Sequence, residues 1–378
     1  LRLGEMSTSL LIRSTVTVPP RSPVSSWDSC SCSRRRGVLG VASSSSSLKA
    51  SSSASLSSSH AEARRSFMFV PYGAPLQQAS VPTITCDGLV PGAALQLTHW
   101  TNNDTPEELY ADTSTEIAFN FLKSSKYAER YEKAGVVNNH YDGDGVFSAF
   151  ALLEPEKALQ HEELLTAAAA VGDFGESPSE EAVKLNAAIE TIGAQHDDDE
   201  MAYEHAFRLL PEMLDNLDAF SDLYEASWDA INDGYRALHS GKVTIELCGD
   251  VAIVREPCDA ARLAPEALHR GLCELGADGL SAKACQRVVR ARRTSHSDEY
   301  LMEVEKPGHG WVKRLARRQT IMDADGGEMA ETLNRAFDLG DTFQPGGEGG
   351  LVALCKTATG VRGVTPLDVA DFIREHKL

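Results

Sequence analysis

The sequence predicts an α/β protein: an N-terminal domain with a mostly parallel sheet and flanking helices, followed by a smaller α+β domain. Three observations indicate this. The chain has 378 residues, 42% of them hydrophobic, which is enough for two domains with their own cores. Short apolar runs bounded by Pro and Gly alternate with stretches whose apolar residues recur at helical spacing. No run approaches the roughly 18 apolar residues of a membrane span, so membrane insertion is not expected.

Charge and serine content divide the chain near residue 65. Residues 1–65 hold nine basic and three acidic residues (+6), so the remainder of the −19 total holds 27 basic and 52 acidic ones (−25). Ser fills twelve of the seventeen positions from 43 to 59. Such a segment buries too little apolar surface to fold, and its composition is typical of an organelle transit peptide. We predict a disordered leader over 1–65 and a chloroplast location. Translation starting at Met68 would instead give a cytoplasmic protein.

The next segment, 66–240, is predicted to form the α/β domain. Strands are expected at 67–70, 81–85, 93–98 and 134–138. Capping boxes predict three helix starts, at Thr105 with Glu108, Thr113 with Glu116, and Ser177 with Glu180. Further helices are expected at 146–153 and, as one or two long amphipathic helices, over 200–238.

The remaining segment, 241–378, is predicted to form the α+β domain. A hairpin is expected with strands at 242–247 and 251–255, followed by a helix at 326–337, a strand at 351–355 and a last helix from Pro366.

Composition excludes several classes of protein. The net charge of −19 argues against a protein that coats nucleic acid, because that function needs a broadly basic surface. Eight cysteines are present without a Cys-x-x-Cys pair, so neither a disulfide scaffold nor a structural zinc module is expected.

One motif stands out for its chemistry, Asn138-Asn-His-Tyr-Asp-Gly-Asp-Gly145. His140, Asp142 and Asp144 occupy alternate positions at a predicted strand end, so their side chains are expected to point the same way. Such a cluster favours a divalent cation, and the oxygen-rich set favours Mn²⁺ or Mg²⁺. A calcium loop of the EF-hand type is excluded, because its twelfth position would be Ala149 or Ala151 instead of Glu. The alternative is a polar turn whose carboxylates cap the following helix.

This segment resembles the first metal-binding motif of the DHH phosphoesterase superfamily, over about 40 residues. The resemblance implies two divalent ions that activate water against a phosphodiester or phosphoanhydride, with His140, Asp142, Asp144 and Asp173 as ligands. In that superfamily the second motif supplies an Asp at the end of the next strand, and Asp173 is similar to it. The Asp-His-His motif that names the superfamily does not occur in this sequence.

Beyond Phe67 the chain also resembles an uncharacterised family of plant and bacterial proteins. The segments that carry this resemblance are Cys86-Asp-Gly-Leu, Leu97-Thr-His-Trp100, Ala111-Asp-Thr-Ser-Thr-Glu-Ile117 and Asn139-His-Tyr-Asp-Gly-Asp-Gly145. That family implies no reaction.

Two other groups of polar residues are candidates for the site. His99 and Asp112 lie beside predicted element ends and are expected either to orient the metal ligands or to serve as turn and cap residues. Positions 287–318 hold nine basic and four acidic residues. Guanidinium groups bind phosphate, so this stretch is expected either to bind an anionic substrate or to pair with surplus carboxylates. The candidates for substrate binding are Arg290, Arg293, Arg314 and Arg317.

Two functions follow from these features. The first is a metal-dependent phosphohydrolase acting on a small anionic or phosphorylated substrate, with catalytic groups beyond the metal ligands not identified. The second is a non-catalytic plastid protein that keeps the metal loop and works in binding or assembly, which the missing Asp-His-His favours. The sequence does not indicate an oligomeric state.

Overall fold

The structure is a computed structural model that describes residues 65–76, 80–276, 287–296, 298–305, 326–346 and 353–378. The predicted leader lies outside the described residues except for Arg65. The α/β class predicted from the sequence is confirmed, with a parallel sheet in the N-terminal part and a separate mixed sheet in the C-terminal part. No helix in the described ranges is long and apolar enough to cross a membrane.

The N-terminal part is built on four parallel strands in the order β1-β4-β2-β3. Its elements are β1 (Phe67–Phe69), β2 (Thr83–Cys86), β3 (Leu95–Leu97), the 3-10 turn η1 (Glu107–Leu109), α1 (Ser114–Lys123), α2 (Ser125–Arg130), β4 (Gly135–Asn138), α3 (Gly143–Leu153), α4 (Pro155–Gln160), α5 (Glu162–Phe174), α6 (Glu180–Ala194), α7 (Asp199–Asp215), η2 (Leu217–Phe220) and α8 (Ser221–His239).

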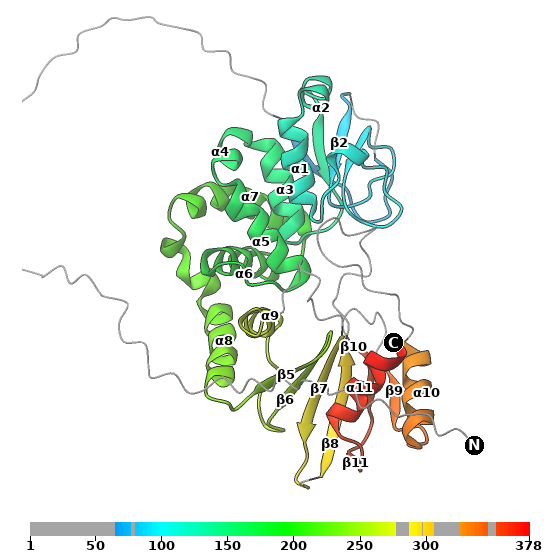
Figure 1. The fold of residues 1–378 in the computed structure, drawn as a ribbon. Coiled ribbons are helices and arrows are strands. Elements are labelled where there is room, and N and C mark those ends of the chain that lie inside the picture. The colour runs from blue at the N-terminus through cyan, green and yellow to red at the C-terminus, as the bar shows by residue number, and fades with distance from the viewer. Residues whose placement is uncertain (1–64, 77–79, 277–286, 297, 306–325, 347–352) are drawn as a thin grey trace, which may run out of the picture.

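Helices cover one face of this sheet (Figure 1). The buried strand residues Ile84, Leu97 and Val136 belong to the same apolar core as Phe147 of α3 and Phe119 of α1. Burial of such side chains contributes roughly 1.5–3 kcal/mol each, which fixes α1 and α3 against the strands. The opposite face is covered by loop residues, with Val137 packed against Val70 and Val90.

Three local predictions were wrong. Thr105 does not cap a helix; its hydroxyl donates to the carbonyl of Thr98, and only the 3-10 turn η1 follows. The cap of α6 is Ser179 instead of Ser177, because the Ser179 hydroxyl accepts from the amide of Ala182. Asp173 lies in the last turn of α5, not at a strand end, since the Ala-rich segment before it is helical. The box at Thr113 is confirmed.

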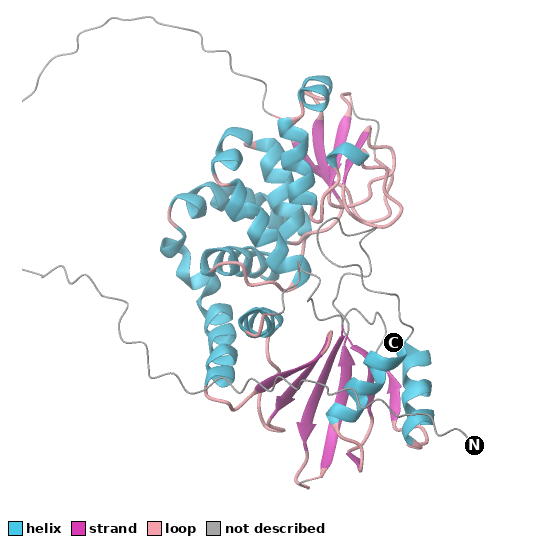
Figure 2. Ribbon diagram, in the orientation of Figure 1, coloured by secondary structure: helices cyan, strands magenta, loops and turns pink. Residues whose placement is uncertain are grey.

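The C-terminal part holds a seven-stranded mixed sheet in the order β5-β6-β7-β8-β10-β9, with β11 paired to β8 (Figure 2). Its elements are β5 (Thr244–Cys248), β6 (Val251–Glu256), α9 (Pro265–Glu274), β7 (Arg287–Arg293), β8 (Glu299–Glu305), α10 (Gly326–Phe337), β9 (Phe343–Pro345), β10 (Ala353–Thr357), β11 (Val361–Arg362) and α11 (Pro366–His376).

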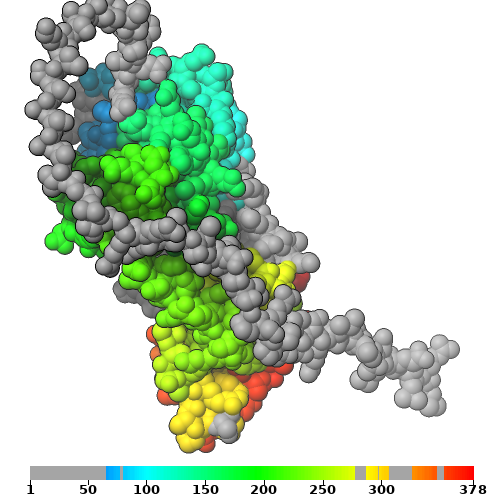
Figure 3. All heavy atoms as spheres, turned by 90° about the vertical axis from the view of Figure 1, so that its left-hand side faces the viewer, coloured from blue at the N-terminus to red at the C-terminus, as the bar shows by residue number. Residues whose placement is uncertain are grey.

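Side chains alternate between the two faces of this sheet. Ile253 and Val289 face α10 and α11, whereas Val254 and Val288 face the opposite way, toward α8 and α9. Helix α8 contacts the core of the N-terminal part as well as this second face of the C-terminal sheet. Its residue Ile231 packs against both groups of buried side chains. Figure 3 shows the blue-to-green N-terminal part above the yellow and red C-terminal part, with α8 at their junction.

The C-terminal sheet contains a buried ion-pair network around Arg290 of β7. Its Nη1 donates to Oε1 of Glu256 at 2.7 Å, and its Nε donates to Oε1 of Glu305 at 2.6 Å. All three residues are buried. Removing one partner of such a network leaves uncompensated buried charge, which is more costly than the net gain from the intact pair.

We expect Arg290→Ala to lower the free energy of unfolding by about 3–5 kcal/mol, because Glu256 and Glu305 lose their shared partner. Arg293→Ala is the matched control: the side chain of Arg293 is exposed at the end of the same strand, and we expect a change within about 0.5 kcal/mol. Urea denaturation of the two variants measures this. Equal, small effects would show that the network does not stabilise the sheet.

Candidate metal centre

The polar residues of interest lie at one edge of the N-terminal sheet. Because β2, β3 and β4 are parallel, their carboxyl ends meet at the same edge, where open α/β sheets bind ligands. Asp87 follows β2 directly, His99 follows β3, and His140 and Asp142 follow β4. Asp144 lies in the first turn of α3. The topology alone therefore brings residues 87, 99 and 140–144 together.

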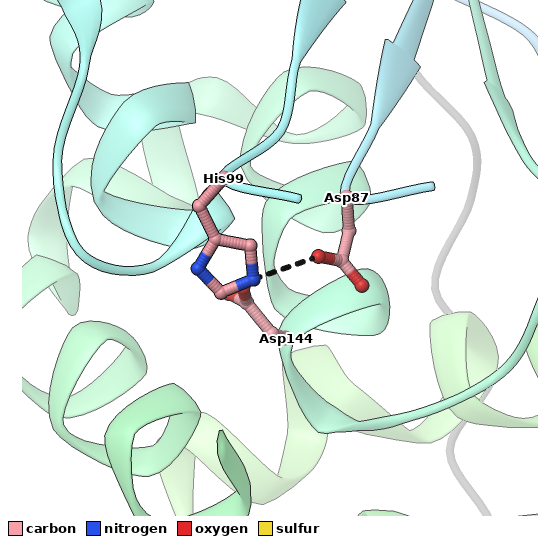
Figure 4. Close-up of side chains that lie close together, drawn as sticks. All are labelled: Asp87, His99 and Asp144. Atoms are coloured by element: carbon pink, nitrogen blue, oxygen red, sulfur yellow. Dashed lines mark ion pairs between the residues drawn. The ribbon is translucent and has the colours of Figure 1, made fainter. Parts of the chain in front are cut away.

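Asp87, His99 and Asp144 form the first of two groups that could hold a metal ion (Figure 4). Nε2 of His99 lies 3.3 Å from Oδ1 of Asp87 and 3.6 Å from Oδ2 of Asp144, and all three side chains are buried. Nδ1 of His99 donates to the backbone carbonyl of Asp112. This hydrogen bond places the proton on Nδ1 and directs Nε2 at the two carboxylates.

Asp87, His140 and Asp142 form the second group. Nε2 of His140 lies 2.9 Å from Oδ2 of Asp87 and 3.1 Å from Oδ2 of Asp142. The side chain of Asp142 is 40% exposed, so this group reaches solvent whereas the first does not. Asp87 takes part in both groups, one oxygen facing each histidine. Its φ of +62° is a conformation that Asp tolerates better than most residues.

Asp173 joins the first group from α5. Its Oδ2 lies 3.8 Å from Nε2 of His99, is buried, and accepts no hydrogen bond from the described residues. A carboxylate in the last turn of a helix also faces the negative end of the helix dipole. Both conditions disfavour the charged form of Asp173 unless a cation lies beside it.

The electrostatics of the site reflect this crowding. Burial, followed by the neighbouring carboxylate of Asp87, raises the pKa of Asp144 to about 6. Burial and the neighbouring Asp144 raise the pKa of Asp173 well above its ordinary value. Burial works to lower the pKa of His140, but Asp142 and Asp87 outweigh it and raise that pKa to about 11. Burial likewise opposes protonation of His99, yet Asp87 and Asp144 raise its pKa.

Helix capping explains only part of this cluster. Asp142 is the N-cap of α3, since its Oδ1 accepts from the amide of Gly145 at 2.8 Å. Asp144 accepts from the amides of Ser114 and Thr115 at the start of α1, at 2.6 and 2.7 Å. Asp87 caps no helix, and Asp173 lies at the wrong end of one. The polar-turn alternative therefore does not account for Asp87 or Asp173.

The structure brings the four predicted ligands together, but not for the predicted reason. His140 and Asp142 lie in a turn beyond the end of β4, and Asp144 belongs to a helix, so strand alternation does not align them. His99, predicted to orient the metal ligands, is itself a candidate ligand. The backbone carbonyl of Asp112 accepts from its Nδ1 and orients the ring. Asp87 was missed as a site residue. The sequence feature that could have indicated it is the pair Asp87-Gly88 directly after the buried strand β2.

The arginines predicted to bind substrate divide into three cases. Arg290 forms ion pairs with Glu256 and Glu305 within the C-terminal sheet. Arg293 is exposed, and its Nη2 donates to the hydroxyl of Tyr300 at 3.0 Å. Arg314 and Arg317 lie outside the described residues.

Residues 65–350 match a family of unknown function, DUF6687. The chain belongs to this family. The prediction of an uncharacterised family is thus confirmed, and DUF6687 carries no assigned reaction. No curated protein matches the sequence. Among solved structures, a pGpG-specific phosphodiesterase, PggH from Vibrio cholerae, is similar with a TM-score of 0.35 and 10% identity, covering 78% of this chain and 81% of that one. A TM-score this low carries no argument about function.

The raised histidine pKa values predict how metal binding depends on pH. A proton must leave each imidazole before Nε2 can ligate an ion, so falling pH weakens binding. Because the pKa of His140 is about 11, this competition continues above neutrality. With Mn²⁺ as the probe, we expect the affinity of the position that includes His140 to rise about tenfold per pH unit from pH 6.5 to 8.5. Isothermal titration at several pH values measures this. A plateau above pH 7 would show that the pKa of His140 is not raised in this way.

Proposed function

We propose that this DUF6687 protein is a divalent-metal-dependent phosphohydrolase with two ion positions, and that Asp87 would contribute a ligand to each. The observation that carries the proposal is the position of Asp87: one buried carboxylate presents its two oxygens to two separate groups, each with a histidine and a second aspartate. The local resemblance of residues 138–145 to the first motif of DHH phosphoesterases agrees with this assignment.

The donor atoms fit a pair of divalent ions. His99, Asp144 and Asp173 would complete the buried position, and His140 and Asp142 the solvent-facing one, with Asp87 shared. Carboxylates favour Mg²⁺ and Mn²⁺, and one imidazole at each position favours Mn²⁺ of these two. Four carboxylates supply four negative charges, which two divalent ions balance. Without that balance Asp144 and Asp173 bind protons more tightly, as their raised pKa values indicate.

Paired ions in such a centre supply an activated water and stabilise the oxygens of the displacement. The residues of this chain set the conditions for that chemistry. Burial of His99 and Asp144 excludes bulk water from one side of the centre. The exposed side chain of Asp142 leaves the other side open to a substrate. We propose a phosphodiester or phosphoanhydride as that substrate.

We propose that Arg293, Arg314 and Arg317 of the basic stretch bind the anionic substrate. Arg290 is not part of the proposed substrate site, because its donors are engaged inside the sheet. We also propose a chloroplast location, which the Ser- and Arg-rich composition of residues 1–65 supports.

We expect Asp87→Asn to abolish Mn²⁺-dependent hydrolysis of bis-p-nitrophenyl phosphate and pyrophosphate, because a single change weakens both ion positions. Asp142→Asn should affect only the solvent-facing position. Asp198→Asn is the control: Asp198 caps α7 through the amide of Glu200, outside both groups. Its activity should match the unmodified chain. Phosphate or nitrophenol release by the full chain, with and without Mn²⁺, measures these effects.

Two outcomes would contradict the proposal. If the unmodified chain retains Mn²⁺ but hydrolyses neither substrate, the alternative of a metal-holding binding or assembly protein is favoured. If Asp87→Asn and the unmodified chain show the same Mn²⁺-dependent rate, Asp87 does not bridge the centre.

A further inference from the structure

The two asparagines that open the metal motif, Asn138 and Asn139, are not ligand candidates, yet both contact the turn that carries Asp87. Together with Tyr203 of α7 they form a hydrogen-bonded set that we call the asparagine clasp. We propose that the clasp is a positioning device for the second ion, holding the turn of His140 at a fixed distance from Asp87. This inference rests on the proposed two-ion centre.

Asn138 links the two turns through its side-chain amide. Its Oδ1 accepts from the amide of Gly88 at 3.0 Å and from the amide of Asn139 at 2.8 Å. Its Nδ2 donates to the hydroxyl of Tyr203 at 2.7 Å. Asn138 is fully buried, so water cannot replace these partners.

Tyr203 fixes the other end of the link. Its hydroxyl donates to the backbone carbonyl of His140 at 2.9 Å. The ring is fully buried and packs against Phe67, Tyr141 and Phe207, at centroid distances of 4.6, 5.1 and 5.3 Å. A rigid aromatic from a distant helix thus holds the backbone of a ligand candidate.

Asn139 orients the imidazole ring of His140 through a side-chain hydrogen bond. Its Nδ2 donates to the carbonyl of Leu89 at 2.9 Å, which leaves Oδ1 to accept from Nδ1 of His140 at 3.1 Å. This contact leaves Nε2 of His140 facing Asp87. The approach is close enough that a Cβ on Gly88 would lie 2.0 Å from Oδ1 of Asn139. Only glycine fits at position 88.

The clasp contacts both turns of the second group, whereas in the first group it contacts only the turn of the shared Asp87. Its side-chain hydrogen bonds connect the turns at 87–89 and 138–140 to each other and to Tyr203, and its imidazole contact is to His140. His99 is oriented separately, by the carbonyl of Asp112. Because only the solvent-facing group has its histidine held by the clasp, loosening the clasp should weaken the solvent-facing ion far more than the buried one.

Tyr203→Phe tests this, because it removes the hydroxyl and keeps the packed ring. We expect the unmodified full chain to bind two Mn²⁺ with an exchange-coupled spectrum in electron paramagnetic resonance. The variant should retain one Mn²⁺ with an uncoupled six-line spectrum, its second ion weakened about 10- to 100-fold. Tyr127→Phe is the matched control, since Tyr127 is buried and its hydroxyl donates to Glu108, outside the site.

The outcomes separate the two proposals. If the unmodified chain binds no Mn²⁺, the proposed function and this inference both fail. If it binds two ions and Tyr203→Phe binds both with unchanged affinity, the clasp has no positioning role, while the proposed function stands. Equal loss of both ions would also overturn the inference, because it would mark general structural damage. Should Tyr203→Phe not fold, Asn139→Ala provides the same test, with the same expected loss of the second ion.

Discussion

The arrangement of this protein's candidate site depends on one buried carboxylate placed between two imidazoles. Asp87 follows a central strand, takes a left-handed backbone conformation, and presents one oxygen to His99 and the other to His140. Burial would raise the pKa of Asp87, but hydrogen bonds from His140 and His99 outweigh burial and lower it below its ordinary value. The charged form of Asp87 is therefore favoured, and its charge acts on the neighbouring Asp144 and Asp173. These two acids bind protons more tightly, which a divalent cation would reverse.

The fold supports this arrangement in unequal ways. The parallel sheet brings the strand ends together, and two helix N-termini stabilise Asp142 and Asp144 through backbone amides. Asp173 receives no such support, being at the carboxyl end of α5. A buried carboxylate at the carboxyl end of a helix does not stabilise the fold. As a metal ligand, in contrast, Asp173 would add a fourth donor to the group of Asp87, His99 and Asp144. The C-terminal sheet, in contrast, balances its own buried charges through Arg290.

Much of the fold was predictable, because its signals are local. The strands at β1 to β4, the capping box at Thr113 and the hairpin of β5 and β6 follow from apolar runs and turn residues near one another in sequence. The site was predictable only where its residues share one motif. Asp87 was not predicted as a site residue, because its partners His99 and His140 lie 12 and 53 residues away in the sequence. Only the order of the strands brings them together. The role of Tyr203 could not be read from the sequence either, since an amphipathic helix displays many aromatic residues without showing which one reaches a ligand turn.

Anomalous diffraction from crystals of the full chain grown with Mn²⁺, collected at the manganese edge, tests the central claim most directly. Two peaks are predicted, one on each side of Asp87, the first within bonding distance of His99 and Asp144 and the second of His140 and Asp142. No peak at this edge of the sheet, with both imidazoles paired directly to the carboxylates, would contradict a metal centre and leave the cluster as a buried ion-pair network.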